Sequence, residues 1–326
     1  MKMITIRRKR LTILFVMDAV EKIDCPNDTS THILIELQTR GHRVFCAEPK
    51  DLELAGGRVI AHAKTVSVTV KNGYRVLGRV KISLDRMDAI FIRKDPPVDL
   101  EYFYMTYLLE RVPARVLMIN SPKGIRDSNE KLYSFQFKKW MPPSLAASNP
   151  DSILSFQNKL KSDVILKPLN DKGGHGISLL KLKDKKRVQM AKRATKNASQ
   201  TILAQQFLQK GLTEGDKRIL LWNGEIIGVF GRMPARGEFR ANLSLGGKCK
   251  KASVTRREKE MISEMKRDFQ RKGLIFVGLD TIAGFVTEIN VTSPAGITDI
   301  NYLYKTKLEC DVVDRFENTI RGRSPC

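Results

Sequence analysis

Three glycines within four positions mark one loop of the sequence as a candidate for binding phosphate. Residues 170–176 read NDKGGHG, and Lys167 stands three positions earlier at the end of an apolar stretch. Glycines let backbone N–H groups close on an anion without interference from Cβ atoms, and a lysine adds a positive charge. The loop is not a Walker A motif, because no Gly-Lys-Ser/Thr follows, and it does not open a helix as GxGxxG does. Spacing alone leaves open both a phosphate loop and a plain tight hairpin, and His175 is more typical of an exposed loop residue than of a catalytic one.

A second group of residues carries the oxygen atoms that a hard cation prefers. Glu288 and Asn290 lie two positions apart on a predicted strand, so both side chains project from one face. Asp280 lies on the preceding predicted strand, across a turn at Gly284, and can face them. Two carboxylates and an amide oxygen suit Mg²⁺, which keeps several waters and shares phosphate oxygens. The spacing predicts a magnesium site, and the solvent-facing side of a hairpin is the alternative.

Arginines recur on and after the strands between these two groups. They are Arg218, Arg232, Arg236 and Arg240, and the glycine pair at 246–247 follows them. The guanidinium fork binds carboxylate and phosphate through two hydrogen bonds. A surface position explains any one of these arginines equally well. Together with a phosphate loop and a magnesium site, they indicate a site for a nucleotide and a carboxylate.

The first 120 residues must form part of the scaffold for these groups, and they alternate strand and helix signals, as in a parallel α/β layer. We predict strands at residues 11–16, 43–47, 65–70, 74–82, 88–93 and 115–120, and helices at 31–40 and 99–111. Ser30 or Thr29 is the expected N-cap of the first helix, and Asn72-Gly73 is a strong hairpin signal. This half is typical of an open nucleotide-fold-like domain whose strand ends deliver polar residues to a crevice.

A change of pattern near residues 120–126 indicates a domain boundary. The order then becomes strand, glycine loop, strand, helix and strand. We predict strands at residues 164–167, 176–182, 201–207, 217–222, 225–233, 274–282 and 285–291, and helices at 127–138, 185–198 and 256–272. The helix at 127–138 would carry Glu130 and Lys131.

Several short strings are highly specific when taken together and in order. They are MD at 17–18, RKDPP at 93–97, NEKL at 129–132, ILKPL at 165–169, GDKR at 215–218, GLIFVGLD at 273–280 and TEINVTSP at 287–294. This series resembles the bacterial glutathione synthetase family of ATP-grasp ligases, and the resemblance runs from about residue 11 to residue 299. It implies an α/β protein with a nucleotide-fold-like (pre-ATP-grasp) domain at residues 1–124. A two-lobed ATP-grasp domain would follow, with its lobes at 125–210 and 211–326.

The resemblance assigns roles to single residues of this chain. The residues that it implies for ATP are Lys131, Lys167, Gly173, Gly174, Gly176, Gln206, Phe207, Leu208 and Asp216. Those implied for magnesium are Asp280, Glu288 and Asn290. Arg218 and Arg232 would face the transferred phosphoryl group and the substrate carboxylate. The residues implied for the peptide substrate are Asp18, Asp28, Thr29, Arg93, Arg240, Asn242, Gly246 and Gly247, with Ser293 near the glycine.

The implied reaction joins γ-glutamylcysteine to glycine. ATP would phosphorylate the cysteinyl carboxylate, and the glycine amine would displace phosphate to give glutathione and ADP. Mg²⁺ is the implied cofactor, with Mn²⁺ as an alternative. The glycine loop and residues 236–247 would act as lids that exclude water. The resemblance also implies a homo-oligomer, since the family suggests a tetramer.

Two segments depart from the family's pattern. The glycine loop replaces the more usual Asp-Gly-Met-Gly-Gly, and residues 239–242 read FRAN where the family often has Arg-Gly-Asn. These differences keep an alternative open, in which a diverged ATP-grasp ligase joins another amino acid to another carboxylate. A rival from another class is an inactive basic protein that binds nucleic acid. That rival predicts loss of Lys167 or of the magnesium residues, and all of them are present.

Composition limits the partners of the chain. The 326 residues carry a formal charge of +23 and are 42% hydrophobic, which is typical of an ordinary globular protein with two or three domains. The charge suggests a polyanion, but its densest runs, at 181–196 and 248–272, have the spacing of solvated helix faces and carry no nucleic-acid motif. We therefore expect no specific nucleic acid as a partner.

The apolar segments and the cysteines indicate the setting of the protein. No segment approaches the roughly 18 uninterrupted apolar residues of a membrane span, so we expect no membrane partner. The five cysteines are widely spaced and form no CxxC pair, which argues against a disulfide framework and a zinc site. The expected location is the reducing cytoplasm.

Overall fold

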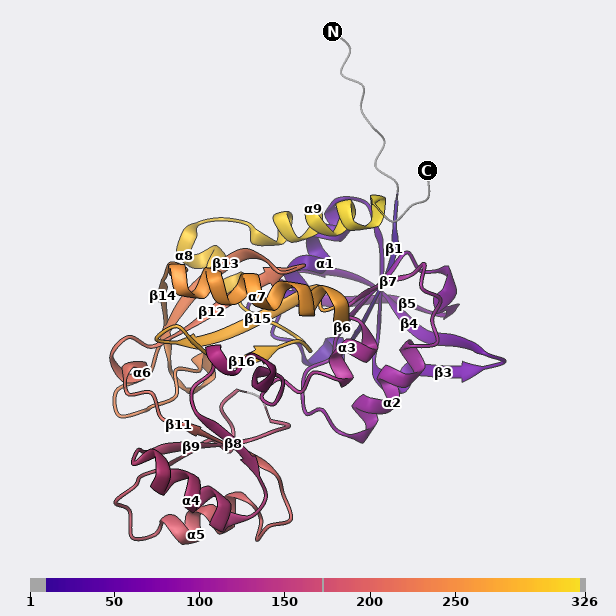
Figure 1. The fold of residues 1–326 in the computed structure, drawn as a ribbon. Coiled ribbons are helices and arrows are strands. Elements are labelled where there is room, and N and C mark those ends of the chain that lie inside the picture. The colour runs from indigo at the N-terminus through magenta and orange to yellow at the C-terminus, as the bar shows by residue number, and fades with distance from the viewer. Residues whose placement is uncertain (1–9, 172, 323–326) are drawn as a thin grey trace.

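The computed structural model describes residues 10–171 and 173–322 of the chain (Figure 1). Three β-sheets organise the described residues, one in the first third of the chain and two in the remainder. Residues 1–9, Lys172 of the glycine loop and residues 323–326 lie outside the described residues.

The first sheet has seven strands in the order β3-β4-β2-β1-β6-β7, with β5 paired to β4. Its central strands β2, β1, β6 and β7 run parallel, which confirms the predicted parallel α/β layer. The strands are β1 (Thr12–Met17), β2 (Arg43–Ala47), β3 (Leu52–Ala55), β4 (Arg58–Thr69), β5 (Gly73–Ser83), β6 (Ala89–Arg93) and β7 (Leu117–Ile119). The helices are α1 (Thr29–Thr39), α2 (Leu100–Leu109) and α3 (Pro122–Arg126), with short 3-10 turns at Val20–Lys22, Pro49–Asp51 and Leu84–Arg86.

Alternate residues of β1 are buried on opposite sides of this sheet. Ile13 and Phe15 pack in the cluster that contains α1, whereas Leu14 and Val16 pack in the cluster that contains α2. A strand that is covered on both faces reads as a continuous apolar run, which is why this one is recognisable in the sequence.

Two details of the first domain differ from the prediction. The N-cap of α1 is Asp28, not Ser30 or Thr29, because its carboxylate accepts a hydrogen bond from Thr31 N at 2.6 Å. The hairpin around Asn72-Gly73 is confirmed, but its first strand begins seven residues earlier than predicted, at Arg58, where it pairs with β3. The sequence prediction missed β3 altogether.

The second sheet is small and antiparallel, with the order β10-β9-β11-β8. Its elements are β8 (Ser144–Ala147), α4 (Pro150–Leu160), β9 (Val164–Pro168), β10 (Ser178–Leu180), α5 (Arg187–Ala194) and β11 (Ile202–Gln206). Val164 and Leu166 pack in one buried cluster with Ile153 of α4. Because side chains alternate along a strand, Ile165 and Lys167 point to the opposite face, away from the helices.

The third sheet is antiparallel with the order β14-β13-β12-β15-β16. Its elements are α6 (Lys210–Thr213), β12 (Asp216–Trp222), β13 (Glu225–Met233), a 3-10 turn at Leu243–Leu245, β14 (Lys248–Lys251), α7 (Arg256–Lys272), β15 (Phe276–Ile282) and β16 (Phe285–Asn290). Met261, Met265 and Phe269 recur every four residues on α7 and are buried in one cluster with Val277 and Leu279. On the opposite face of β12 and β15, Leu220, Trp222 and Phe276 are buried in a second cluster, and the charged residues of this face include Arg218 and Asp280.

The predicted helix at 127–138 is wrong. Residues 129–132 form a turn in which the Asn129 side chain accepts hydrogen bonds from Lys131 N at 3.2 Å and Leu132 N at 3.1 Å. A kinked 3-10 segment, Tyr133–Trp140, follows. Asparagine side chains compete in this way with helical hydrogen bonds. The basic run at 248–272 is also only partly helical, since residues 248–251 form β14.

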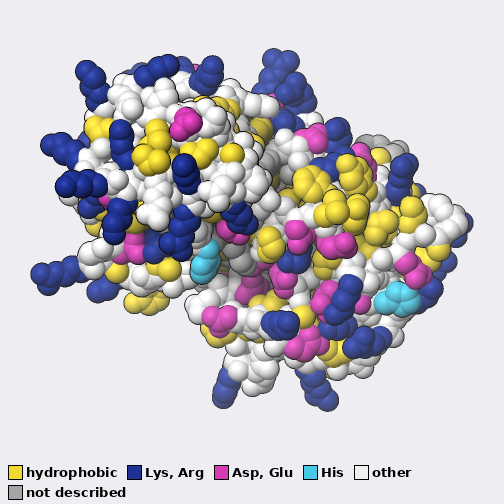
Figure 2. Space-filling model, turned by 90° about the horizontal axis from the view of Figure 1, so that it is seen from below, with side chains coloured by type: hydrophobic (Ala, Val, Ile, Leu, Met, Phe, Trp, Pro, Cys, Tyr) yellow, Lys and Arg dark blue, Asp and Glu magenta, His cyan; other side chains and the backbone are white. Residues whose placement is uncertain are grey.

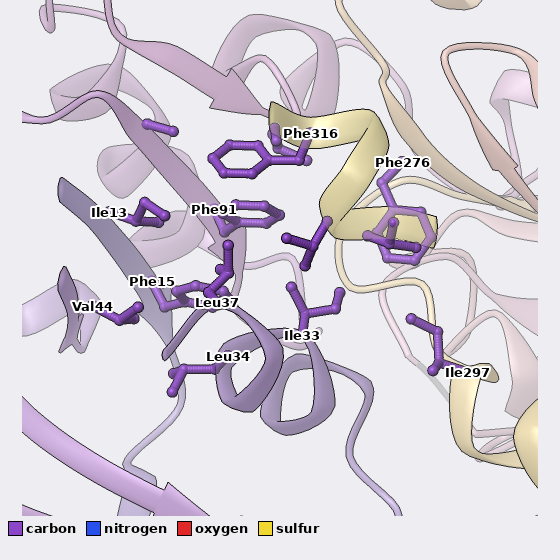
Figure 3. Close-up of a cluster of buried hydrophobic side chains, with 14 of the residues drawn as sticks. Ile13, Phe15, Ile33, Leu34, Leu37, Val44, Phe91, Phe276, Ile297 and Phe316 are labelled. Atoms are coloured by element: carbon purple, nitrogen blue, oxygen red, sulfur yellow. The ribbon is translucent and has the colours of Figure 1, made fainter. Parts of the chain in front are cut away.

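The chain ends in two helices that the sequence prediction did not include, α8 (Ile297–Tyr304) and α9 (Leu308–Arg321). Phe316 of α9 lies 5.1 Å, between ring centroids, from Phe91 of β6, which stacks on Phe15 of β1 at 4.8 Å (Figure 3). The end of the chain therefore completes the core of the first domain.

Lys and Arg side chains are scattered over the face seen in Figure 2, and Asp and Glu side chains lie among them. No helix among the described residues is long and apolar enough to cross a membrane.

Candidate active site

A cleft with about 890 Å³ of empty space, part of it open to solvent, lies between the second and third sheets. The predicted site residues that line it from the second sheet and its loops are Lys167, Gly173, Gly174, Gln206, Phe207 and Leu208. Those that line it from the turn at 129–132, the third sheet and the lid are Lys131, Asp216, Arg232, Arg240, Asn242, Asp280 and Glu288. The structure thus gathers most of the ATP and magnesium predictions in one cleft.

Strand register places charged residues side by side on the third sheet. Arg218 of β12 stands opposite Asp280 of β15, which stands opposite Glu288 of β16. In the next row, Asp216 of β12 stands opposite Arg232 of β13. Because side chains alternate along each strand, these residues share the face turned away from α7.

Two arginines hold the Asp280 carboxylate. Arg218 binds it through Nε and through Nη2, the latter at 2.9 Å from Oδ2, and Arg232 Nη2 lies 3.0 Å from the same oxygen. Burial opposes ionisation of Asp280, but the two guanidinium groups outweigh it and hold the pKa of this carboxyl below its usual value. Asp280 is therefore an anion at neutral pH although it is buried.

Asp216 forms a two-bond pair with Arg232. Arg232 Nε lies 2.7 Å from Oδ1 and Nη2 lies 2.9 Å from Oδ2. Burial raises the pKa of Asp216, and the neighbouring charge of Arg232 opposes that rise. Arg232 thus joins Asp216 and Asp280 into one charged group on the cleft wall.

Two lysines reach the cleft from different segments. Lys167 Nζ on β9 donates to Gln205 Oε1 at 2.9 Å and to Thr287 O at 3.3 Å. Lys131 Nζ donates to Asp171 O at 2.7 Å and lies 3.1 Å from Glu288 Oε1. Burial lowers the pKa of Lys167, and Glu288 partly offsets that effect.

The glycine loop is covered by residues 236–247, which we call the lid. Arg240 Nη1 of the lid donates to Gly174 O at 3.0 Å. Gly174 has a φ of +79°, and a Cβ atom there would lie 2.6 Å from Asn242 Oδ1, so only glycine permits this approach. Phe239 of the lid meets Phe207 edge to face, with ring centroids 6.4 Å apart.

Glu238 holds the lid arginine in place. Its carboxylate accepts hydrogen bonds from Phe239 N at 2.8 Å and from Arg240 N at 3.1 Å, and Arg240 Nη2 lies 2.7 Å from its second oxygen. The hydrogen bond from Arg240 lowers the pKa of Glu238 to about 2. The carboxylate is therefore ionised throughout the physiological range.

One end of the cleft is apolar and fits a base. Ile165, Ile177 and Ile282 line it beside Phe207 and Leu208. Gln206 N and Phe207 N donate to Pro143 O at 2.9 Å and to Asp163 O at 3.0 Å. These two N–H groups are therefore not the ones that would meet adenine, and other polar groups of the strand end, such as Leu208 N–H, would have to do so.

The donor set around Asp280 fits a hard divalent cation. Asp280 and Glu288 supply carboxylate oxygens from adjacent strands, and Asn290 donates through Nδ2 to Gly278 O at 3.2 Å, which leaves its Oδ1 as an acceptor. The described residues hold no group of three or more His, Cys, Asp or Glu that could bind a metal ion without help. Waters and phosphate oxygens would complete such a shell, as is usual for Mg²⁺.

Of the residues predicted for the peptide substrate, Arg240 and Asn242 line the cleft, and the others lie outside its lining. Arg93 Nε donates to Ser30 Oγ at 2.8 Å and Nη2 donates to Pro294 O at 2.9 Å, while its Nη1 is buried without a hydrogen-bond partner. Thr29 Oγ1 accepts from Gly296 N at 3.2 Å. These contacts bring the first domain against residues 293–297, where Ser293 is half-buried.

Seven other predicted residues also lie outside the cleft lining. Asp28 caps α1, and Asp18 pairs with Lys94 at 2.9 Å. A Cβ atom at Gly176 would lie 2.7 Å from the Pro168 side chain and one at Gly247 would lie 2.4 Å from Ala241 O, while Gly246 turns the lid with a φ of +84°. Arg218 and Asn290 act on the cleft wall through Asp280 and Gly278.

Four polar residues at the site were missed by the sequence prediction: Asn120, Glu130, Gln205 and Glu238. Glu130 and Asn120 bind the chain just after the candidate magnesium strand, with Glu130 Oε1 accepting from Val291 N and Asn120 Nδ2 donating to Val291 O, both at 2.8 Å. Only the position of Glu130 within NEKL could have signalled its importance. Val291 lies more than 160 residues along the chain from both Glu130 and Asn120, and no local sequence pattern encodes such contacts.

The sequence of this chain is similar to known proteins over nearly its whole length. The N-terminal domain of prokaryotic glutathione synthetase matches residues 11–126, and its ATP-grasp domain matches residues 130–305. A glutathione synthetase of Nostoc sp. (strain PCC 7120) is 35% identical over 323 residues, covering 95% of this chain and 99% of its own length. One from Pseudomonas syringae pv. tomato is 36% identical over 312 residues, covering 94% of this chain and 97% of its own.

Solved structures with low sequence identity share the fold. The crystal structure of D-cycloserine synthetase DcsG superposes with a TM-score of 0.64 at 11% identity and covers 94% of this chain and 99% of its own. The ATP-grasp ligase PsnB, in complex with a minimal precursor, gives 0.62 at 15% identity and covers 97% of this chain and 99% of its own. The expected fold, a nucleotide-fold-like domain followed by a two-lobed ATP-grasp domain, is confirmed, and the chain belongs to the prokaryotic glutathione synthetase family.

Proposed function

We propose that this chain joins γ-glutamylcysteine to glycine at the expense of ATP, forming glutathione, ADP and phosphate. The single observation that carries the proposal is the cleft, where lysines, arginines and paired carboxylates from both sheets meet next to an apolar end. Its support is membership of a family whose named relatives are glutathione synthetases matching more than 90% of this chain. The alternative, a ligase for another carboxylate and amine, is not favoured by these relatives.

The first step creates a better electrophile. The cysteinyl carboxylate attacks the terminal phosphorus of ATP, a new O–P bond forms, and ADP leaves. Lys131, Lys167 and Arg232 line the cleft. In this proposal the two lysines bind the phosphate oxygens, and Arg232 stabilises the charge that develops on the transferred group. The apolar end lined by Ile165 and Ile282 would take the base.

We propose Asp280, Glu288 and Asn290 as the residues that hold Mg²⁺, with Mn²⁺ as an alternative. When bound there, the ion would supply positive charge to the phosphate oxygens of ATP. Because Arg218 and Arg232 keep the Asp280 carboxyl ionised, this proposed metal ligand is a carboxylate at neutral pH. Glu288 is now paired with Lys131, so both groups would reorient towards the phosphates when ATP enters.

The second step forms the amide. The glycine amine attacks the carbonyl carbon of the acyl phosphate, phosphate leaves with the former carboxylate oxygen, and the amine loses its proton. The lid and the glycine loop meet through Arg240 and Gly174, which would keep water from hydrolysing the acyl phosphate. Arg93, with an unpartnered buried Nη1, and Thr29 would bind the dipeptide beside residues 293–297.

An oxygen-transfer experiment tests this route. The dipeptide is labelled with ¹⁸O in its cysteinyl carboxylate and is incubated with ATP, Mg²⁺ and glycine. One ¹⁸O atom per turnover should appear in inorganic phosphate, because the carboxylate oxygen leaves with the phosphoryl group. Unlabelled phosphate alongside glutathione would contradict the acyl-phosphate route.

Two further expectations belong to this proposal. The substrate ATP and the family's chemistry favour a cytoplasmic setting, and the resemblance favours a homo-tetramer. Light scattering coupled to gel filtration would measure the mass of the assembly directly. A monomer near 37.0 kDa would contradict the oligomer.

A further inference from the structure

The backbone of Val291 is held at both of its polar groups by buried side chains from a different part of the chain. Glu130 Oε1 accepts from Val291 N at 2.8 Å, and Asn120 Nδ2 donates to Val291 O at 2.8 Å. We call Asn120, Glu130 and Val291 the Val291 clamp. Asn120 is 2% exposed and Glu130 is 9% exposed, so water does not replace these bonds.

Each member of the Val291 clamp has further bonds to the same region. Glu130 Oε1 also accepts from Thr292 N at 3.0 Å and from Thr292 Oγ1 at 2.8 Å, and Glu130 O accepts from Ile289 N at 2.9 Å. Asn120 Nδ2 donates to Phe276 O, and Asn120 Oδ1 accepts from Phe276 N, both at 2.7 Å. The clamp therefore fixes both the start of β15 and the end of β16.

The residues on the two sides of Val291 serve different halves of the proposed reaction. Upstream, Glu288 and Asn290 belong to the proposed magnesium site, and Lys131, which follows Glu130 directly, lies 3.1 Å from Glu288. Downstream, Pro294 O accepts from Arg93 Nη2 at 2.9 Å and Ala295 O accepts from Arg218 Nη1 at 3.2 Å. One short segment thus connects the phosphate end of the site to the dipeptide end.

We propose that Glu130 and Asn120 are positioning residues of the ligation, which hold the magnesium strand in register with Lys131 and with the loop that meets the dipeptide. The inference rests on the proposed function. A residue that holds the metal ligands in place affects the site through their geometry, and its loss typically weakens metal affinity or activity about 10–100-fold. Displacement of reacting groups by about 1 Å can cost about 100-fold in rate.

Calorimetric binding of Mg²⁺·ADP, together with steady-state ligation, tests the proposal in Glu130→Ala and Glu130→Gln. Glu130→Ala should weaken Mg²⁺·ADP binding about 10–100-fold, raise the Mg²⁺ concentration for half-maximal activity and lower kcat. Glu130→Gln retains an oxygen that accepts from Val291 and Thr292, so it should stay within about threefold of the wild type. Binding of Mg²⁺·ADP to the wild type tests the clamp separately from the proposed function, because it does not depend on which carboxylate substrate the enzyme joins to an amine.

Glu317→Ala is the matched control. Glu317 of α9 is buried like Glu130, at 4% exposed, and binds His42 and Arg321, neither of which belongs to the Val291 clamp. It should lower the melting temperature without changing the Mg²⁺ requirement. A shift in Tm alone, in both alanine variants, would show that Glu130 is merely structural and would overturn the proposal.

Milder variants cover the case in which Glu130→Ala does not fold. Thr292→Val removes one of the three donors to Glu130, and Asn120→Ala frees Val291 O; both should raise the Mg²⁺ requirement in the same direction. Normal Mg²⁺ dependence in these folded variants would overturn the clamp. The wild type could bind Mg²⁺·ADP, with Glu130→Ala weakening that binding, and yet make no glutathione. This result would overturn the proposed substrate and support the clamp.

Discussion

Charged side chains in the cleft are held by ion pairs with one another. Asp280 is flanked by Arg218 and Arg232, and Glu288 is paired with Lys131. The Asp280 group, fixed in this way before the reaction, needs little reorganisation when charge develops on a phosphoryl group, whereas Glu288 and Lys131 would have to separate first. At the residue scale, the site is built from pairs, and each pair links neighbouring strands or segments.

Glu288→Gln tests the pair closest to the proposed metal. The substitution keeps the size of the side chain but removes its negative charge, so the proposed Mg²⁺ should be held less tightly. Because the ion then neutralises less of the phosphate charge, kcat should fall by about 100-fold or more. Initial rates of phosphate release at saturating ATP measure the effect. Glu225→Gln is the control, since Glu225 lies on β13 of the same sheet and forms an ion pair only with Lys266 among its described contacts. An equal loss in both variants would contradict the assigned role.

Residue types and period-two spacing were sufficient to predict the charged cleft wall. Glu288 and Asn290 alternate on one strand, and Asp280 falls opposite Glu288 as predicted. The pairing of Asp280 with two arginines was not predictable, because it depends on the register of β12 and β13. Glu130 was placed on a helix that does not exist, so its contacts with Val291 and Thr292 could not be foreseen.

At the scale of elements, α7 supports the sheet that carries the site. Its N-terminus is closed by a capping box, in which Thr255 Oγ1 accepts from Glu258 N at 3.2 Å and Glu258 Oε2 accepts from Thr255 N at 2.8 Å. Glu258 also binds Lys217 of β12 at 2.8 Å and Thr281 of β15 at 2.9 Å. One buried carboxylate therefore fastens the helix to two strands that hold Arg218 and Asp280.

Glu258→Ala should lower the free energy of unfolding by about 2–4 kcal/mol at pH 7, since it leaves several donors unpaired. Burial opposes ionisation of Glu258, but its hydrogen bonds outweigh burial and lower its pKa below 4.5. A carboxyl with a lowered folded pKa stabilises fully above its ordinary value and loses that contribution as pH falls through the folded value. Urea unfolding should therefore show the gap to the wild type narrowing below about pH 4.5.

Exposed Glu260 on the same helix gives the comparison. It pairs with Arg256 one turn away, and Glu260→Ala should change stability by no more than about 0.5 kcal/mol. If Glu258→Ala costs as little as Glu260→Ala, or if its gap to the wild type is constant with pH, the assigned role of Glu258 is wrong.

The lid is a second element with a measurable task. Arg240→Ala removes the contact with Gly174 O and should admit water to the acyl phosphate. The ratio of phosphate released to glutathione formed should rise above one, while ATP turnover persists. Arg236→Ala on the same lid is the control, because Arg236 makes no hydrogen bond or ion pair within the part of the chain that the structure describes; a ratio of one in both variants would rule out this role.

Many elements with strong local patterns were predicted, although α4, which Asn149 caps and Pro150 begins, was missed, and elements defined by distant contacts were not predicted. α7, β2 and β13 occupy the predicted residues, since helix period, caps and apolar runs define them. α9 has an amphipathic pattern, but its partner is the core around Phe91 in the first domain, so its place depends on the tertiary fold. The turn at 129–132 is held by an Asn129 side chain that overrides helical propensity.

At the scale of the whole molecule, the charge of +23 is compatible with a small anionic substrate. On the face seen in Figure 2, the basic side chains are spread out rather than gathered into one stripe. A net positive field attracts ATP and a peptide that carries carboxylates, and salt screens it over about 8–10 Å at physiological ionic strength.

Rates at low ATP should therefore depend on ionic strength. Raising salt from about 0.05 M to about 0.3 M should lower kcat/KM for ATP several-fold, while kcat changes little, because screening acts on encounter. A control with an uncharged viscous solute separates screening of charge by salt from a general inhibition of the enzyme by added solute. Independence of kcat/KM from salt would show that the surface charge does not assist substrate capture.

The requirement for both acceptor substrates tests the central claim most directly. Phosphate release from ATP and Mg²⁺ is measured with γ-glutamylcysteine alone, glycine alone, neither and both. We predict sustained release only with both, with one glutathione formed for each phosphate. Equal turnover without the dipeptide, or with glycine replaced by unrelated amino acids, would contradict the assignment.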